Sequence, residues 1–159
     1  MLLNALVEGA LLFYMGPSLL GFAPGWRKTL WGGIVVGVAG FLIRSLTDLH
    51  YIPIGAHTVI GALVLILFLR FSLPVPWGIA SAAGLLSFTL LLLTGTASVF
   101  GAVLLLGWDF KEVLENPVLR FFFGLLEDLP LGILALLCRL YKFQLFQFET
   151  GDPGAMGRL

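Results

Sequence analysis

Charge is the scarcest property of this sequence. Of its 159 residues only 11% are charged, whereas 59% are hydrophobic, and the mean hydropathy is +1.04. Because a soluble domain carries charge on about a quarter of its residues, this composition excludes a soluble globular protein. It predicts an all-α, polytopic integral membrane protein, whose helices of roughly 20 apolar residues satisfy their own backbone hydrogen bonds inside the lipid bilayer.

Other features that the sequence lacks exclude several classes of function. Nine basic and nine acidic residues cancel and form no block of one sign, so we expect no binding to nucleic acid. One cysteine, Cys138, and two histidines offer no cluster at metal-ligand spacing. The HExxH and GxSxG motifs are also missing from the sequence. We therefore expect a protein that is not an enzyme and that uses neither a metal nor a cofactor.

Five apolar stretches are long enough to cross a membrane. They cover residues 3–22, 29–46, 54–72, 77–98 and 118–141. Residues 76–107 carry no charged side chain, and this stretch is long for one span and short for two. We predict a break at "TGTAS" (94–98) and an interfacial segment over 100–117, with six spans as the alternative. The membrane domain is expected over residues 1–145, followed by a short flexible cytoplasmic tail over 146–159.

The distribution of Lys and Arg indicates an orientation. With five spans and the N-terminus outside, most basic residues face the cytoplasm, as the positive-inside rule requires. Six spans would place nearly equal numbers of basic residues on the two sides of the membrane. In the five-span arrangement, the cytoplasmic basic residues are Arg27, Lys28, Arg70, Arg139, Lys142 and Arg158, and the outer ones are Arg44, Lys111 and Arg120. We therefore predict an N-out, C-in helical bundle.

Ionisable side chains gather at the predicted outer ends of the helices. Glu8 lies between one and two turns from the outer end of the first helix, and Arg44 lies near the outer end of the second, so the two should meet. The other residues on this side are Asp48, His50, His57 and Arg120. One interpretation is a structural ion pair with solvated neighbours. The other is an outward-opening pocket in which these six residues bind a ligand or sense pH.

Glu127 and Asp128 form a second candidate site, an intramembrane acidic site. If the last helix begins near Pro117, the two acids lie about 15 Å into the membrane, at 1.5 Å per residue. Pro130 would then kink or interrupt the helix beside them, which is typical of a cation or proton site. If "VLRFFFGLL" is instead an interfacial re-entrant segment and the spanning helix begins near Leu129, both acids lie at the outer surface and Pro130 takes the first helical position.

Small residues at helical spacing predict close helix packing, within the chain or between copies. They are Gly33, Gly37 and Gly40 in "GGIVVGVAG", and Ala80 and Gly84 in "ASAAG". Hydroxyl side chains in the fourth stretch should bond to a carbonyl one turn back in their own helix rather than to a ligand. They are Ser87, Thr89, Thr94, Thr96 and Ser98.

Three motifs resemble the multi-pass N-terminal input regions of Gram-positive sensor histidine kinases. They are "LNALVEGALLFY" at the start, "PGWRK" in the first turn and "NPVLRFFFG" before the last helix. Residues 142–159 alone follow that helix, so we expect neither a phosphoacceptor domain nor an ATP-binding domain. The resemblance implies a stand-alone sensory or regulatory module of a bacterial cytoplasmic membrane, acting through a protein partner or as a homo-oligomer.

Two other functions remain open at this point. A small transporter subunit or channel would place Glu127 and Asp128 on the path of an ion or solute. A purely structural assembly subunit would depend only on close helix packing.

Overall fold

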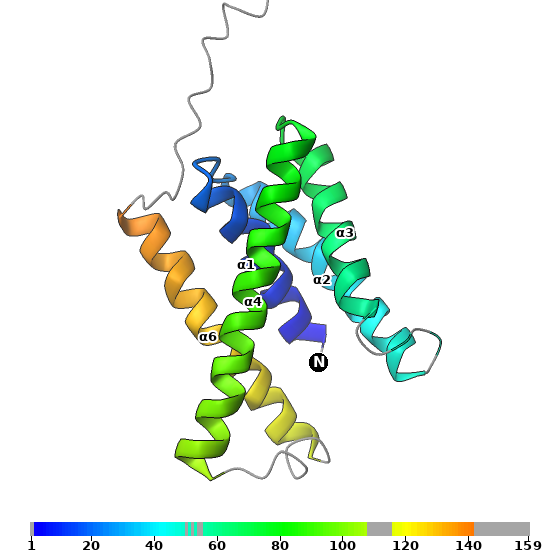
Figure 1. The fold of residues 1–159 in the computed structure, drawn as a ribbon, viewed down its shortest axis with the longest axis vertical. Helices are drawn as coiled ribbons and strands as arrows, with labels where there is room; N and C mark the ends of the chain where they lie inside the picture. The colour runs from blue at the N-terminus through cyan, green and yellow to red at the C-terminus, as the bar shows by residue number, and fades with distance from the viewer. Residues whose placement is uncertain (1, 50, 52, 54–55, 108–115, 142–159) are drawn as a thin grey trace, which may run out of the picture.

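The protein is a bundle of helices (Figure 1). The computed structural model describes residues 2–49, 51, 53, 56–107 and 116–141, and this part of the chain contains five helices and no strand. The helices are α1 (Leu2–Leu19), α2 (Trp26–Asp48), α3 (Ala56–Ser72), α4 (Trp77–Leu106) and α6 (Pro117–Tyr141). Consecutive helices run in opposite directions, so α1, α3 and α6 finish on one side of the bundle and α2 and α4 on the other (Figure 1). The predicted all-α class is confirmed.

Four of these helices, α1, α2, α4 and α6, are long and apolar enough to cross a membrane. The fifth, α3, has 17 residues, about 25 Å at 1.5 Å per residue. Large apolar side chains cover the outside of the bundle: Trp31 is 69% exposed, Leu93 65% and Ile133 52%. Soluble monomers rarely expose contiguous apolar surface on this scale. The outer surface is therefore suited to lipid.

The predicted break at 94–98 is wrong. α4 is one helix of 30 residues that continues through this segment, so 100–106 extend α4 instead of forming an interfacial piece. The segment contains no proline, and the hydroxyl of Thr94 is satisfied by donating to the carbonyl of Leu90 at 2.8 Å. Farther along, Ala102 of α4 is buried with Phe123 of α6, which stabilises the extension. Residues 108–115 and the predicted tail, 146–159, lie outside the described residues.

The beginning of α6 distinguishes the two interpretations of the acidic pair. Asn116 precedes Pro117, the first helical residue, and its Oδ1 accepts a hydrogen bond from the N–H of Val118 at 2.9 Å, an arrangement typical of a helix N-cap. The helix then continues through Pro130 to its end. The alternative in which the helix begins near Leu129 is therefore wrong.

Glycine lets α1 and α2 approach each other closely. A Cβ atom added to Gly9 would lie 2.5 Å from the backbone nitrogen of Gly37, and one added to Gly37 would lie 2.5 Å from the carbonyl oxygen of Ala5. A Cβ on Gly33 would lie 2.6 Å from the Cβ of Ala10. Since real Cβ atoms do not approach other atoms this closely, the contact requires glycine at these positions.

The other predicted packing residues divide between two environments. Ala80 is fully buried, and a Cβ on Gly84 would overlap the side chain of Ile66, so both lie where α4 packs against its neighbours. A Cβ on Gly40 would have no heavy atom within 4 Å. Gly40 therefore faces open space instead of a neighbouring helix.

A tightly packed apolar core fills the half of the bundle where α6 finishes. The helix α1 is central and contacts α2, α3, α4 and α6. The fully buried apolar side chains include Phe13, Met15, Leu65, Leu69 and Leu131. The opposite half, where α1 begins, contains Glu8, Arg44 and Glu127.

Candidate functional site

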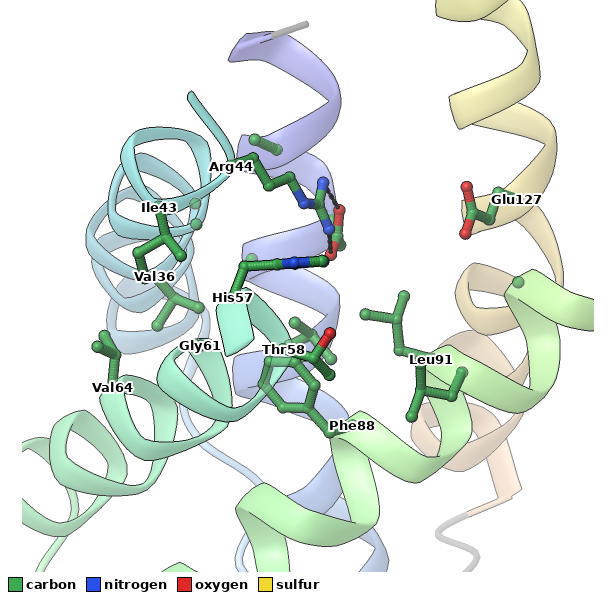
Figure 2. A pocket seen from close by; sticks show the side chains of 18 of the residues that line it. Val36, Ile43, Arg44, His57, Thr58, Gly61, Val64, Phe88, Leu91 and Glu127 are labelled. Atoms are coloured by element: carbon green, nitrogen blue, oxygen red, sulfur yellow. Dashed lines mark hydrogen bonds and ion pairs between the residues drawn. The ribbon is translucent and has the colours of Figure 1, made fainter. Parts of the chain in front are cut away.

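A cavity of about 310 Å³ lies where α1, α2, α3, α4 and α6 converge (Figure 2). We call it the polar cavity. Its walls are mostly hydrocarbon, and every one of the five helices contributes to its lining. The polar side chains that line it are Glu8, Arg44, His57, Thr58, Thr96 and Glu127.

Glu8 and Arg44 form a bidentate ion pair at one wall of the polar cavity. Nη1 of Arg44 donates to Oε2 of Glu8 at 2.8 Å, and Nη2 donates to Oε1 at 2.5 Å. Glu8 is 14% exposed and Arg44 51%. The pair lies beside the close contact between Gly9 and Gly37, which brings the two helices together at this height. The structure thus brings together the two residues that are predicted from the sequence to meet.

Glu127 faces this ion pair from the other side of the cavity. Figure 2 shows its carboxylate on α6 directed across the cavity toward Arg44. The carboxylate lies against Gly95 of α4, because a Cβ added there would be 2.5 Å from Oε1 of Glu127. Six residues before Glu127, the carbonyl of Phe121 accepts a hydrogen bond from the amide of Asn4 at 3.1 Å. This bond fixes the height of α6 against α1.

His57 projects into the polar cavity from the first turn of α3, toward the ion pair (Figure 2). Its Nδ1 is buried and has no hydrogen-bond partner in the described part of the chain. The hydroxyl residue Thr58 follows it and also lines the cavity. An imidazole nitrogen in this position is available to donate to or accept from a bound molecule.

Asp128 does not share the environment of Glu127. Consecutive residues of a helix differ by about 100° in direction, and Asp128 is absent from the lining of the polar cavity. It is only 6% exposed. Glu127 therefore lines the cavity, whereas Asp128 is buried outside its lining and still interacts electrostatically with Glu8, Glu127 and Arg44.

Three of the predicted site residues cannot be added to this group. His50 lies outside the described residues, and the side chains of Asp48 and Arg120 are likewise outside the described part of the structure, although their backbones belong to α2 and α6. The candidate site therefore consists of Glu8, Arg44, His57 and Glu127 from the predicted sets.

No family model, curated protein or solved structure matches this chain. Within the described residues, no group of three or more His, Cys, Asp or Glu side chains is arranged to hold a metal ion.

The hydroxyl residues of α4 follow the prediction only in part. Thr89 donates to the carbonyl of Leu85 at 2.9 Å, and Thr94 bonds within α4 as described above, so both are confirmed. Ser87 corrects the prediction: its hydroxyl donates to the carbonyl of Leu12 on α1 at 2.8 Å. The close approach of α1 and α4 puts that carbonyl within reach, so the bond joins two helices instead of one turn.

Several residues that shape the cavity were not singled out from the sequence. Phe88, Leu91 and Gly95 of α4 line it, at the three- and four-residue spacing of one helix face. The expected break at 94–98 separates Gly95 from Phe88 and Leu91, whereas one uninterrupted helix over 77–106 places all three on a common face.

Proposed function

We propose that this chain is a non-enzymatic sensory or regulatory module of a bacterial cytoplasmic membrane, and that it binds a small ligand in the polar cavity and acts through a protein partner or a second copy. The polar cavity carries the proposal. It combines hydrocarbon walls with a few convergent polar groups from five helices, which is the usual composition of a small-molecule site. A ligand that contacts all five helices can change their packing.

The packing of the bundle favours binding over conduction. Between the polar cavity and the opposite end lie fully buried side chains such as Phe13, Leu69 and Leu131. Closely packed protein interiors contain few voids larger than a water molecule. A channel or transporter would need these residues to move aside, whereas a binding module does not.

The proposed orientation places the polar cavity toward the outer face. The described residues Arg27, Lys28, Arg70 and Arg139 belong to helix ends on the side where α6 finishes. Basic residues favour the cytoplasmic side, so this end would face the cytoplasm. The N-terminus and the polar cavity would then lie toward the outside, where a sensory input arrives.

The resemblance to sensor-kinase input regions supports a regulatory role by analogy. Those regions are membrane modules whose output is carried by another domain. Here the output would pass to a separate protein or to a homo-oligomer. The proposal therefore requires a partner whose association depends on the state of the cavity.

The test fills part of the cavity with a larger side chain and measures how much of the partner protein is recovered. Gly40→Leu places a side chain into the cavity space beside α2, because no heavy atom lies within 4 Å of the added Cβ. Gly132→Leu is the matched control, since its Cβ also meets nothing within 4 Å and Gly132 does not line the cavity. The protein is purified from its native membrane in mild detergent, and its associated proteins are quantified by mass spectrometry.

We expect Gly40→Leu to change the recovery of the partner at least threefold and Gly132→Leu to leave it unchanged. Equal recovery of the partner with the natural sequence, Gly40→Leu and Gly132→Leu would contradict the regulatory function. Solute or cation flux in liposomes that is lost in Glu127→Gln would instead establish the transporter alternative.

A further inference from the structure

The charges in the polar cavity do not balance. The guanidinium of Arg44 is bound by both carboxylate oxygens of Glu8, so these two charges neutralise each other. Glu127 makes no hydrogen bond or ion pair within 4.0 Å to any other described residue. An unpaired charge near hydrocarbon is unfavourable unless a partner is supplied. The cavity thus has one carboxylate in excess and space beside it.

The walls specify what kind of cation fits that space. Apart from the polar side chains already named, the lining consists of glycine and of aliphatic and aromatic residues, which include Leu12, Val64, Phe88 and Leu91. An organic cation can place its hydrocarbon part against such walls. An apolar cavity of about 150 Å³ accommodates benzene, so 310 Å³ leaves room for a small organic group and its charged end.

An inorganic cation fits this lining poorly. Ca²⁺ takes roughly six to eight oxygen ligands, and Mg²⁺ requires about six in an octahedron. The uncommitted side-chain oxygens of the described lining belong to Glu127 and to the hydroxyls of Thr58 and Thr96, which come from three different helices. Hydrocarbon occupies the directions that further ligands would need.

We propose that the polar cavity is a site for a small organic ammonium ion, with its nitrogen bound by Glu127 and its hydrocarbon part against Phe88 and Leu91. His57 supplies the second polar contact through Nδ1, which is buried and has no partner among the described residues. The Glu8–Arg44 pair forms the opposite wall and keeps Arg44 from neutralising Glu127. This inference deepens the proposed function and rests on it for its biological meaning.

Binding of benzylammonium tests the proposal directly. The full chain is reconstituted into nanodiscs of phosphatidylcholine and titrated calorimetrically with benzylammonium chloride at constant ionic strength. Benzyl alcohol serves as the neutral probe of the same shape, and NaCl and KCl serve as the inorganic probes. We expect saturable binding of benzylammonium at least tenfold tighter than binding of benzyl alcohol, because a charge-assisted hydrogen bond is stronger than a neutral one.

Two variants locate the site. Glu127→Gln preserves the shape of the side chain and removes its charge, and we expect it to weaken benzylammonium binding at least tenfold. Asp128→Asn is the comparison, because it removes the neighbouring carboxylate, which does not line the cavity but interacts electrostatically with Glu127, and it should weaken binding clearly less than Glu127→Gln does. Each variant is first checked for unchanged elution on gel filtration.

Three results would overturn the proposal: equal affinity for benzylammonium and benzyl alcohol, displacement of benzylammonium by millimolar Na⁺ or K⁺, or unchanged binding to Glu127→Gln. The first two comparisons need only the natural sequence, so they test the proposal even if a variant fails to fold.

The outcomes also separate this inference from the function on which it rests. If benzylammonium does not bind while Gly40→Leu still changes partner recovery, the ligand class is wrong and the regulatory function stands. If benzylammonium binds while Gly40→Leu has no effect on partner recovery, the ligand class stands and the regulatory function is wrong.

Discussion

The hydroxyl of Ser87 on α4 accepts a hydrogen bond from the backbone N–H of Gly16 on α1, at 2.9 Å. The same hydroxyl donates to the carbonyl of Leu12, so one side chain bonds to two backbone groups one turn apart. The approach is close because Gly16 has no Cβ, which would overlap the carbonyl of Ala83. Ser87 is fully buried. It joins α1 and α4 next to Leu12 and Phe88, which line the polar cavity.

Ser87→Ala should destabilise the bundle by about 1–3 kcal/mol, because buried backbone groups lose a hydrogen-bond partner. The measurement is reversible unfolding in mixed micelles, followed by circular dichroism. Thr89→Ala is the control: Thr89 is exposed and bonds only within α4, so its loss should cost less than about 0.5 kcal/mol. If the two variants were equally stable, the interhelical bond would contribute nothing measurable.

Gly37→Ala should destabilise the bundle by about 1–3 kcal/mol, since the added methyl group overpacks the α1–α2 contact. The overlapping atoms belong to the backbone of Ala5 and Leu6, which cannot move aside as a side chain would. Gly40→Ala, three residues along the same helix, should be neutral or slightly stabilising because alanine favours the helix. Thermal unfolding of the two variants in parallel checks this, and a more stable Gly37→Ala protein would contradict the packing argument.

The Glu8–Arg44 pair should show a coupling free energy of about 1–3 kcal/mol in a double-mutant cycle. The cycle compares Glu8→Gln, Arg44→Ala and the double variant by unfolding in micelles. The expected value is below that of a fully buried pair because half of the Arg44 side chain is exposed. Strict additivity of the single changes would mean that the two side chains do not stabilise each other.

Gly95→Ala should weaken benzylammonium binding threefold to tenfold while changing stability by less than about 1 kcal/mol. The added methyl group would meet the end of the Glu127 side chain, which is flexible and can swing away from its present position. Calorimetric titration and thermal unfolding of the same preparation measure both quantities. Gly101→Ala, also in α4 with open space around its Cβ, should bind normally; equal loss in both variants would point to a general effect on α4.

Cysteine labelling tests the proposed orientation. Leu49 and Arg27 are exposed at opposite ends of α2, so Leu49→Cys should react with an impermeant maleimide in intact cells and Arg27→Cys only after lysis. The variants are made with Cys138→Ser, although the native thiol is itself buried in the core. The reverse pattern would invert the orientation and move the polar cavity to the cytoplasmic side.

Much of the fold followed from the sequence because each feature involved is local. Long runs of apolar residues specify spanning helices, and the prolines and glycines between them mark the ends of α1, α2 and α3. The sequence leaves two alternatives at Pro130, because proline is accepted either at the start of a helix or within one. The break expected at 94–98 failed because the packing of α4 against α6 overrides the weak helix propensity of "TGTAS".

The sequence alone determined that the protein is an all-helical membrane bundle and that Glu8 meets Arg44, since hydropathy and the counted distance along two antiparallel helices are sufficient for both. Only the tertiary structure decided that Glu127 lines the cavity beside that pair while Asp128 does not, and that Gly37 packs against α1 while Gly40 faces open space. Which side chains share a cavity depends on how each helix is rotated about its axis. That rotation is set by contacts between distant residues, such as Gly9 with Gly37 and Ser87 with Gly16, which no local pattern encodes.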